Sequence, residues 1–273
     1  MRSDSGLIYC GQWLTAPWQS LCVYFAQIRE VQDLDLFDDN EVYPNQPLSD
    51  VACEVRFKGE MQVECERHLF WEAIRSSYVD ILVPQIQEGQ AVALQHYKFR
   101  DPSTTRIVSV ALNSIAFSEA KYSGHKSFID EFARLISVFR KLYPSLGQIT
   151  RIGWRYINVM PFSREDGMVP LGRILKLDVS LPLDMFKRTA NIDLKWTGKA
   201  TDGEVIIRLS DAVQKNLPEQ EAMILDIDFG RVNPEIGWDA VKGVIENVRR
   251  SCRCIFEGMI TEEYRTYLRG ETI

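Results

Sequence analysis

Features that would place the chain in a membrane or on nucleic acid are missing from the sequence. The most apolar segment, residues 6–27, is interrupted by Gly, Gln, Thr, Pro and Ser before about 18 apolar residues accumulate, so we do not expect it to span a membrane. The opening residues MRSDSG carry an acid where a secretory leader is basic, which predicts a cytoplasmic protein. A net charge of −6 does not indicate nucleic acid as the main partner, although a chain with this net charge can still have a local basic groove.

Recognisable catalytic and metal-binding signatures are also missing. The chain has no Gly-x-Ser-x-Gly elbow, no Walker loop and no dinucleotide-binding fingerprint. Cys65 and His68 have zinc-like spacing, but the sequence has only 3 histidines and no second pair that would complete four ligands. The 6 cysteines follow no disulfide framework, which indicates reduced thiols. We therefore expect no cofactor and favour a binding role over catalysis.

The composition of the chain predicts a soluble globular protein. The 273 residues are 45% hydrophobic and 26% charged, which is enough to build a core in one large domain or two smaller ones. Residues 1–42 lack periodicity and include the acidic run DLDLFDDNE, so we interpret them as an N-terminal extension or lid. The patterns that follow predict two further parts, residues 43–165 and residues 166–273.

Residues 43–165 carry alternating and helical patterns in a ferredoxin-like order. The segment VACEVRF, residues 51–57, alternates apolar and polar side chains, as a half-buried strand does. The segment 127–143 has a wide apolar stripe at helical spacing and is ended by Pro144. The predicted elements are strand 51–57, helix 68–79, strand 91–99, strand 106–117, helix 127–143 and strand 151–160. This order is the split βαβ arrangement of ferredoxin-like domains.

Residues 166–273 predict an antiparallel sheet followed by one long C-terminal helix. Apolar residues spaced three and four apart between Val241 and Met259 indicate the helix. The strand candidates are 173–181, 191–196, 204–210 and 222–229. Together the two parts predict an α+β protein.

The most unusual segment is RIGWRYINV, which begins at Arg151. In a strand, Arg151, Gly153 and Arg155 share one face, and the glycine leaves a space between two guanidinium groups. Such a notch would hold a carboxylate or a phosphate by paired hydrogen bonds. The alternative, which we favour, is that both arginines pair with acids of the protein, with Glu54 on the neighbouring strand as the natural partner. The two aromatic residues on the opposite face are expected in the core.

The pattern R-x-G-x-R-Y-x-N in this segment, together with NQPLSDVACEVRF and IFEGMIT, resembles a sporadically distributed family of uncharacterised prokaryotic proteins. The similarity covers residues 43–265 and leaves out the N-terminal extension. The family's patchy occurrence implies horizontal transfer, as for accessory genes of defence or toxin–antitoxin modules. The resemblance gives the hallmark residues of the family, which are our candidate ligand-binding residues: Arg151, Gly153, Arg155, Tyr156 and Asn158.

A second candidate site lies in ILDIDFG, where Asp226 and Asp228 share a strand face. Two such carboxylates can hold a divalent metal while Arg151 and Arg155 clamp a phosphate, which is the alternative of a metal-dependent phosphoester hydrolase or nuclease. The sequence identifies no third oxygen ligand, so we favour a solvated sheet face. The leading prediction is a non-enzymatic binding or regulatory protein whose partner is a protein or a small anionic ligand, and the oligomeric state is left open.

Overall fold

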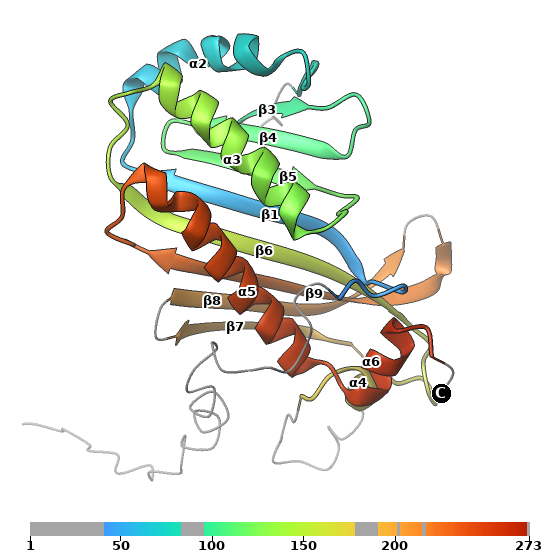
Figure 1. The fold of residues 1–273 in the computed structure, drawn as a ribbon. Helices are drawn as coiled ribbons and strands as arrows, with labels where there is room; N and C mark the ends of the chain where they lie inside the picture. Colours follow the sequence, from blue (N-terminus) through green and yellow to red (C-terminus); the bar gives the residue numbers. More distant parts are fainter. Residues whose placement is uncertain (1–40, 83–95, 178–190, 201–202, 215–216, 272–273) are drawn as a thin grey trace, which may run out of the picture. The chain divides into compact units, whose positions relative to one another are not determined.

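The structure, a computed structural model, describes residues 41–82, 96–177, 191–200, 203–214 and 217–271. All of them belong to one unit that spans residues 35–273. Nine strands form one sheet in the order β2-β3-β4-β5-β1-β6-β9-β8-β7, and every neighbouring pair is antiparallel (Figure 1). The strands are β1 (Leu48–Phe57), β2 (Asp80–Leu82), β3 (Tyr97–Arg100), β4 (Arg106–Ala111), β5 (Ser114–Glu119), β6 (Ile149–Phe162), β7 (Asp193–Ala200), β8 (Gly203–Gln214) and β9 (Leu217–Val232).

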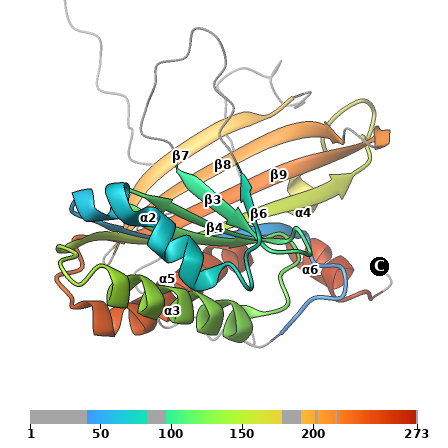
Figure 2. The ribbon, with the colours of Figure 1, turned by 90° about the horizontal axis from the view of Figure 1, so that it is seen from above.

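Three long helices cover one face of this sheet (Figure 2). They are α2 (Met61–Ile74), α3 (His125–Leu142) and α5 (Val241–Met259), and the last of these confirms the predicted C-terminal helix. Shorter helical elements are α4 (Leu171–Ile174), the 3-10 helix η2 (Trp238–Ala240) and α6 (Glu262–Leu268). The α+β class and the antiparallel sheet are therefore confirmed.

The core lies between the sheet and these helices. Side chains of a strand alternate between its two faces, so every second residue of β1 is buried under the helices. These residues are Val51, Cys53, Val55 and Phe57, as the alternating pattern predicts. Helix α3 contributes its predicted apolar stripe, which consists of Phe128, Ile129, Phe132, Leu135, Ile136 and Phe139. On β6, Trp154 is fully buried with its ring centroid 4.8 Å from that of Phe128, so the aromatic residues of the motif belong to the core as expected.

The segment 106–117, predicted as one long strand, is a hairpin instead. Strand β4 ends at Ala111, a two-residue turn follows, and Ser114 begins β5 opposite it. The carbonyls of Leu112 and Asn113 accept hydrogen bonds from the backbone N–H groups of Glu60 and Phe57. The turn is thus held by residues distant in the sequence, and the alternating pattern runs through it without a strong local turn signal.

Two other predicted elements differ from the structure. The helix expected at 68–79 is α2, which begins earlier because the side chain of Glu60 accepts a hydrogen bond from the N–H of Gln62 and so caps the first turn. The strand expected at 173–181 is wrong for its first residues, which form the end of α4 and a single bridge from Leu175 to Ile260. The rest of that prediction, residues 178–181, lies outside the described residues, as does most of the strand expected at 91–99.

Strands from both predicted parts of the chain meet in the middle of the sheet. Strand β6 pairs with β9 from Arg151↔Val232 to Phe162↔Glu221, and β1 lies on the other side of β6. The division of the chain at residues 42 and 165 stays a prediction. None of the helices in the described part of the chain is long and apolar enough to cross a membrane.

The first described residues are attached to the C-terminal helices. Tyr43 is buried, and its hydroxyl donates to the carboxylate of Glu257 on α5 at 2.9 Å. The side-chain amide of Asn45 donates to the carbonyl of Tyr267 on α6. These contacts place residues 41–47 over one end of α5, where they form part of the pocket described below.

Candidate functional site

The residues of the candidate motif divide between the two faces of β6. Arg151, Gly153 and Arg155 project from the face opposite the long helices, which we call the open face. Tyr156 and Asn158 are buried on the helix face. The five residues are neighbours in the sequence, but the structure places them in two separate environments.

On the open face, Arg155 is bound by an acid of the neighbouring strand. Its guanidinium donates two hydrogen bonds to the carboxylate of Asp226, at 2.7 and 2.8 Å. Arg208, which lies opposite Asp226 in the β8–β9 register, donates to the same carboxylate at 2.8 Å. The Asp226 side chain is only 7% exposed, whereas both arginines are 43% exposed.

Arg151 lies across two glycines. Gly153 of β6 and Gly230 of β9 are directly opposite, and a Cβ added to either would fall within 3 Å of the Arg151 guanidinium. With both side chains absent, the guanidinium reaches over the strands and donates to the carboxylate of Asp228. Glu54 is farther away, with its carboxylate oxygen 3.7 Å from Arg151.

The space over Gly153 is therefore filled by a side chain of the protein itself. The favoured interpretation, pairing of both arginines with protein acids, is confirmed. The predicted partner Glu54 forms a longer ion pair with Arg151, at 3.7 Å, whereas Asp228 and Asp226 make the direct hydrogen bonds and were not predicted. Glu54 instead accepts from Arg56 at 2.7 Å.

The carboxylates that the alternative function requires are thus occupied by arginines. Among the described residues, no group of three or more His, Cys, Asp and Glu is placed to hold a metal ion. Burial raises the pKa of the Asp226 carboxyl, but the hydrogen bonds and charges of Arg155 and Arg208 outweigh burial and leave that pKa below its usual value. Asp226 is therefore ionised at neutral pH and neutralised by its two arginines.

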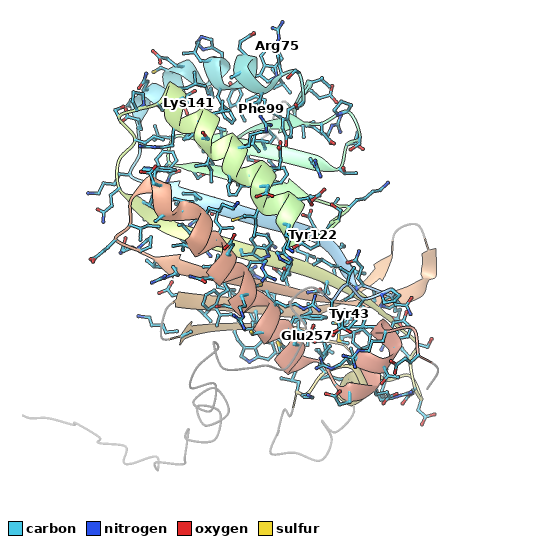
Figure 3. The ribbon with its side chains drawn as sticks, in the orientation of Figure 1. Tyr43, Arg75, Phe99, Tyr122, Lys141 and Glu257 are labelled. Atoms are coloured by element: carbon cyan, nitrogen blue, oxygen red, sulfur yellow. The ribbon has the colours of Figure 1, made fainter. Side chains whose placement is uncertain are left out.

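A pocket lies on the helix face, where β6 passes under α5. It has a volume of about 60 Å³ and is bounded by β6, the start of α3, α5 and residues 41–48. Figure 3 shows Tyr122 beside the start of α3, and Tyr43 and Glu257 near the second half of α5. We call it the Tyr122 pocket, and its polar lining includes Tyr122, Tyr156, Asn158, Arg249 and Arg253.

Two arginines one helical turn apart lie in the wall of the Tyr122 pocket, and Glu41, the acid in its lining, is paired with Arg269. Arg249 is only 5% exposed, and Arg253 follows it at i+4 on α5. Both arginines act electrostatically on the hydroxyls of Tyr122 and Tyr156. A cation removed from water beside a cavity favours an anion in that cavity, because little solvent screens the attraction.

Arg253 is fixed by a buried ion-pair network behind the pocket. The carboxylate of Glu257 is fully buried and contacts Arg253 at 2.7 Å. The same carboxylate accepts from Arg265, which is also buried, and from the Tyr43 hydroxyl. Arg253 in addition lies 5.0 Å from the centre of the Tyr43 ring. The position of Arg253 is therefore set by Glu257 of its own helix and by Tyr43, and Arg265 holds Glu257 in place.

The tyrosines of the pocket are hydrogen-bond donors at neutral pH. Burial raises the pKa of Tyr156 to about 12, and burial together with Glu257 raises that of Tyr43 to about 12. Burial and the neighbouring Tyr156 raise the pKa of Tyr122 as well, and the two hydroxyls are hydrogen-bonded. Asn158 donates from its amide to the carbonyl of Leu225 at 3.1 Å, which fixes its side chain at the pocket wall.

Three of the pocket residues, Tyr122, Arg249 and Arg253, were not singled out from the sequence. The available signal was the pair of arginines four residues apart, which borders the apolar stripe of α5 at Val248 and Cys252. Arginines beside such a stripe are commonly solvated, so this spacing alone does not indicate burial.

No protein-family model and no curated protein matches the chain.

Proposed function

We propose that this protein is a non-catalytic binding protein that holds a small anionic group, a phosphate or a carboxylate, in the Tyr122 pocket. The observation that carries the proposal is the buried Arg249 in the wall of that cavity, one turn from Arg253 and beside two protonated tyrosine hydroxyls. These groups supply positive charge and, because one of the two hydroxyl protons is used in the bond between the tyrosines, one hydroxyl donor, and oxyanions prefer such contacts. The proposal keeps Tyr156 and Asn158 of the motif as ligand-binding residues and gives Arg151, Gly153 and Arg155 a structural role.

The size of the pocket limits the ligand. A volume of about 60 Å³ corresponds to roughly two water molecules at the density of the liquid, so only a compact group whose atoms are covalently bonded can enter it. Acetate has four heavy atoms and phosphate has five, so either group fits. A larger ligand would insert only its anionic end and would leave the remainder outside.

Calorimetric titration of the full chain with inorganic phosphate, and separately with acetate, tests this proposal and distinguishes the two groups. Arg249→Gln removes a charge that we place beside the anion, so it should weaken binding by about 10- to 100-fold. Tyr122→Phe removes one hydroxyl and keeps the ring, and should weaken binding by about 3- to 10-fold. Arg155→Gln, on the open face, is the matched control and should leave the affinity unchanged.

Binding that is unaltered in both pocket variants, or lost in Arg155→Gln, would overturn the proposal. Hydrolysis of a phosphodiester in Mg²⁺ or Mn²⁺ that Asp226→Asn abolishes would instead support the alternative of a metal-dependent hydrolase. The arginine pairs of Asp226 and Asp228 favour the binding function over this alternative.

Two broader parts of the proposal rest on other observations. A ferredoxin-like arrangement for this part of the chain is supported by its strand order, β4-β5-β1-β6. The elements concerned are β1, α2, β4, β5, α3 and β6. Superposition of an experimental structure on ferredoxin-like domains tests it. The resemblance carried by R-x-G-x-R-Y-x-N supports a role as an accessory component of a prokaryotic defence or toxin–antitoxin module, and phage plating on cells with and without the gene tests that role.

A further inference from the structure

A second hollow lies between α3 and the start of α5, with a volume of about 410 Å³. One wall is a stripe of α3 at helical spacing, formed by Ala133, Ile136, Ser137, Arg140 and Lys141. The other wall is formed by η2 and the first residues of α5, including Trp238, Val241 and Lys242. We call it the α3–α5 groove. Figure 3 shows Lys141 near the C-terminal end of α3, distant from Tyr43 and Glu257.

The groove has an apolar floor and a basic rim. Ile136 and Val241 are buried at the floor, and Trp238 is partly buried beside them. The guanidinium of Arg140 lies 5.4 Å from the centre of the Trp238 ring. Lys141 and Lys242 are exposed at the rim, and Asp239 is the acid among the residues that line the groove. The lining is therefore positive in a chain whose net charge is −6.

The dipole of α3 accounts for only some of these cations. Arg140 and Lys141 lie in the last turn of α3, where positive charge stabilises a helix. Lys242 lies in the first turn of α5, which contains no acid, and a cation is unfavourable at that end of a helix. Its ion pair with Asp130 joins two side chains that are 52% and 67% exposed, so water competes with the pair and it opens at little cost.

We infer that the α3–α5 groove binds an acidic amphipathic helix of a partner protein. The α3 stripe from residue 133 to residue 141 spans roughly two helical turns, or about 12 Å, which matches a short helical segment lying alongside. The floor suits apolar side chains on one face of such a helix, and Arg140 together with the two lysines of the rim suits Asp or Glu on its flanks. This surface is distinct from the Tyr122 pocket, so the inference does not rest on the proposed function.

Fluorescence anisotropy with the full chain tests the inference. The probe is a labelled, helix-forming peptide with Leu on one face and Glu on the other, and a second peptide carries Lys in place of Glu. The wild type should bind the Glu peptide and not the Lys peptide. Lys141→Glu combined with Lys242→Glu should weaken binding by about tenfold or more, because it reverses two charges at the rim.

Lys195→Glu combined with Lys199→Glu is the matched control, because both residues are exposed on β7 and the change in net charge is the same. This variant should bind the Glu peptide within about twofold of wild type. Equal loss in both double variants, or equal binding of the two peptides, would overturn the inference. Displacement of the peptide by single-stranded RNA would assign the groove to nucleic acid. Self-association in light scattering that Lys141→Glu with Lys242→Glu abolishes would assign it to a second copy, and either result would also overturn the inference.

Discussion

A carboxylate bound by two arginines lies on each side of the sheet, Asp226 on a strand and Glu257 on helix α5, but the two sites differ in their access to water. On the open face, Asp226 is held by Arg155 and Arg208, each 43% exposed. On the helix face, Glu257 is fully buried, and one of its partners, Arg265, is only 8% exposed. An exposed charge that loses its partner is hydrated by water, whereas a buried charge that loses its partner is not, and this destabilises the fold. The same pair chemistry should therefore contribute differently to stability on the two faces.

The largest effect is expected for Glu257→Gln. The substitution leaves Arg265 buried beside an uncharged side chain, which should lower the free energy of unfolding by about 3–5 kcal/mol. Denaturant unfolding followed by circular dichroism measures this, with the 76% exposed Glu262 changed to Gln as the control. A loss no larger than that of the control would mean that water reaches the Glu257 network.

Asp226→Asn should cost less, about 1–3 kcal/mol. It removes charged hydrogen bonds, but Arg155 and Arg208 remain half-exposed and can be hydrated. The same unfolding assay applies, and Asp193→Asn on the exposed edge of β7 is the matched control. If Asp226→Asn proved as costly as Glu257→Gln, exposure would not be what separates the two faces.

The pH dependence of stability provides a third test, and its expected size is no larger than the effect of Asp226→Asn. Because the folded-state pKa of Asp226 is lowered, its contribution to stability is present above the unfolded pKa of Asp, near 3.9, and is lost as pH falls through the folded value. The stability difference between wild type and Asp226→Asn should therefore shrink as the pH is lowered below about 4. Unfolding curves between neutral and acidic pH test this, and a difference that is constant over the range would contradict it.

Gly153→Ala should have the smallest effect, about 1 kcal/mol of destabilisation. The new Cβ would lie 2.1 Å from Nη1 of Arg151, so the flexible guanidinium must move and its hydrogen bond to Asp228 is weakened. Gly198→Ala in β7 is the control, because its Cβ would make an ordinary 3.4 Å contact with Val205. Equal melting temperatures for the two variants would show that the Arg151 bridge contributes nothing measurable.

Local patterns in the sequence predict those parts of the fold that depend on alternation or helical spacing. Strand β1 and helices α3 and α5 follow from such patterns, because each buries one face against the same core. The hairpin turn at Leu112 and Asn113 does not, since its carbonyls are bound by Phe57 and Glu60 after a reversal of the chain. Residues 171–174 carry no clear helical signal and form α4 in contact with the C-terminal segment.

In the candidate site, too, some features follow from local sequence patterns and others depend on the whole fold. That Arg151 and Arg155 pair with protein acids follows from the cost of leaving such charges unpaired in a sheet. The acids with which they pair depend on the register of β6 against β9, and that register is set by the whole sheet. The Tyr122 pocket requires β6, α3, α5 and residues 41–48 to meet, so no single segment of the sequence indicates it.

The contact between Tyr43 and Glu257 has a consequence for how the protein is made. The two residues are 214 positions apart in the sequence, and β1, which follows Tyr43, lies in the interior of the sheet. A ribosome therefore releases Tyr43 and β1 long before it has synthesised the helix that buries Tyr43. Contacts between such distant segments form late and slow folding. The apolar face of β1 must stay soluble during synthesis, and a chain stopped before α5 would present that face to chaperones and proteases.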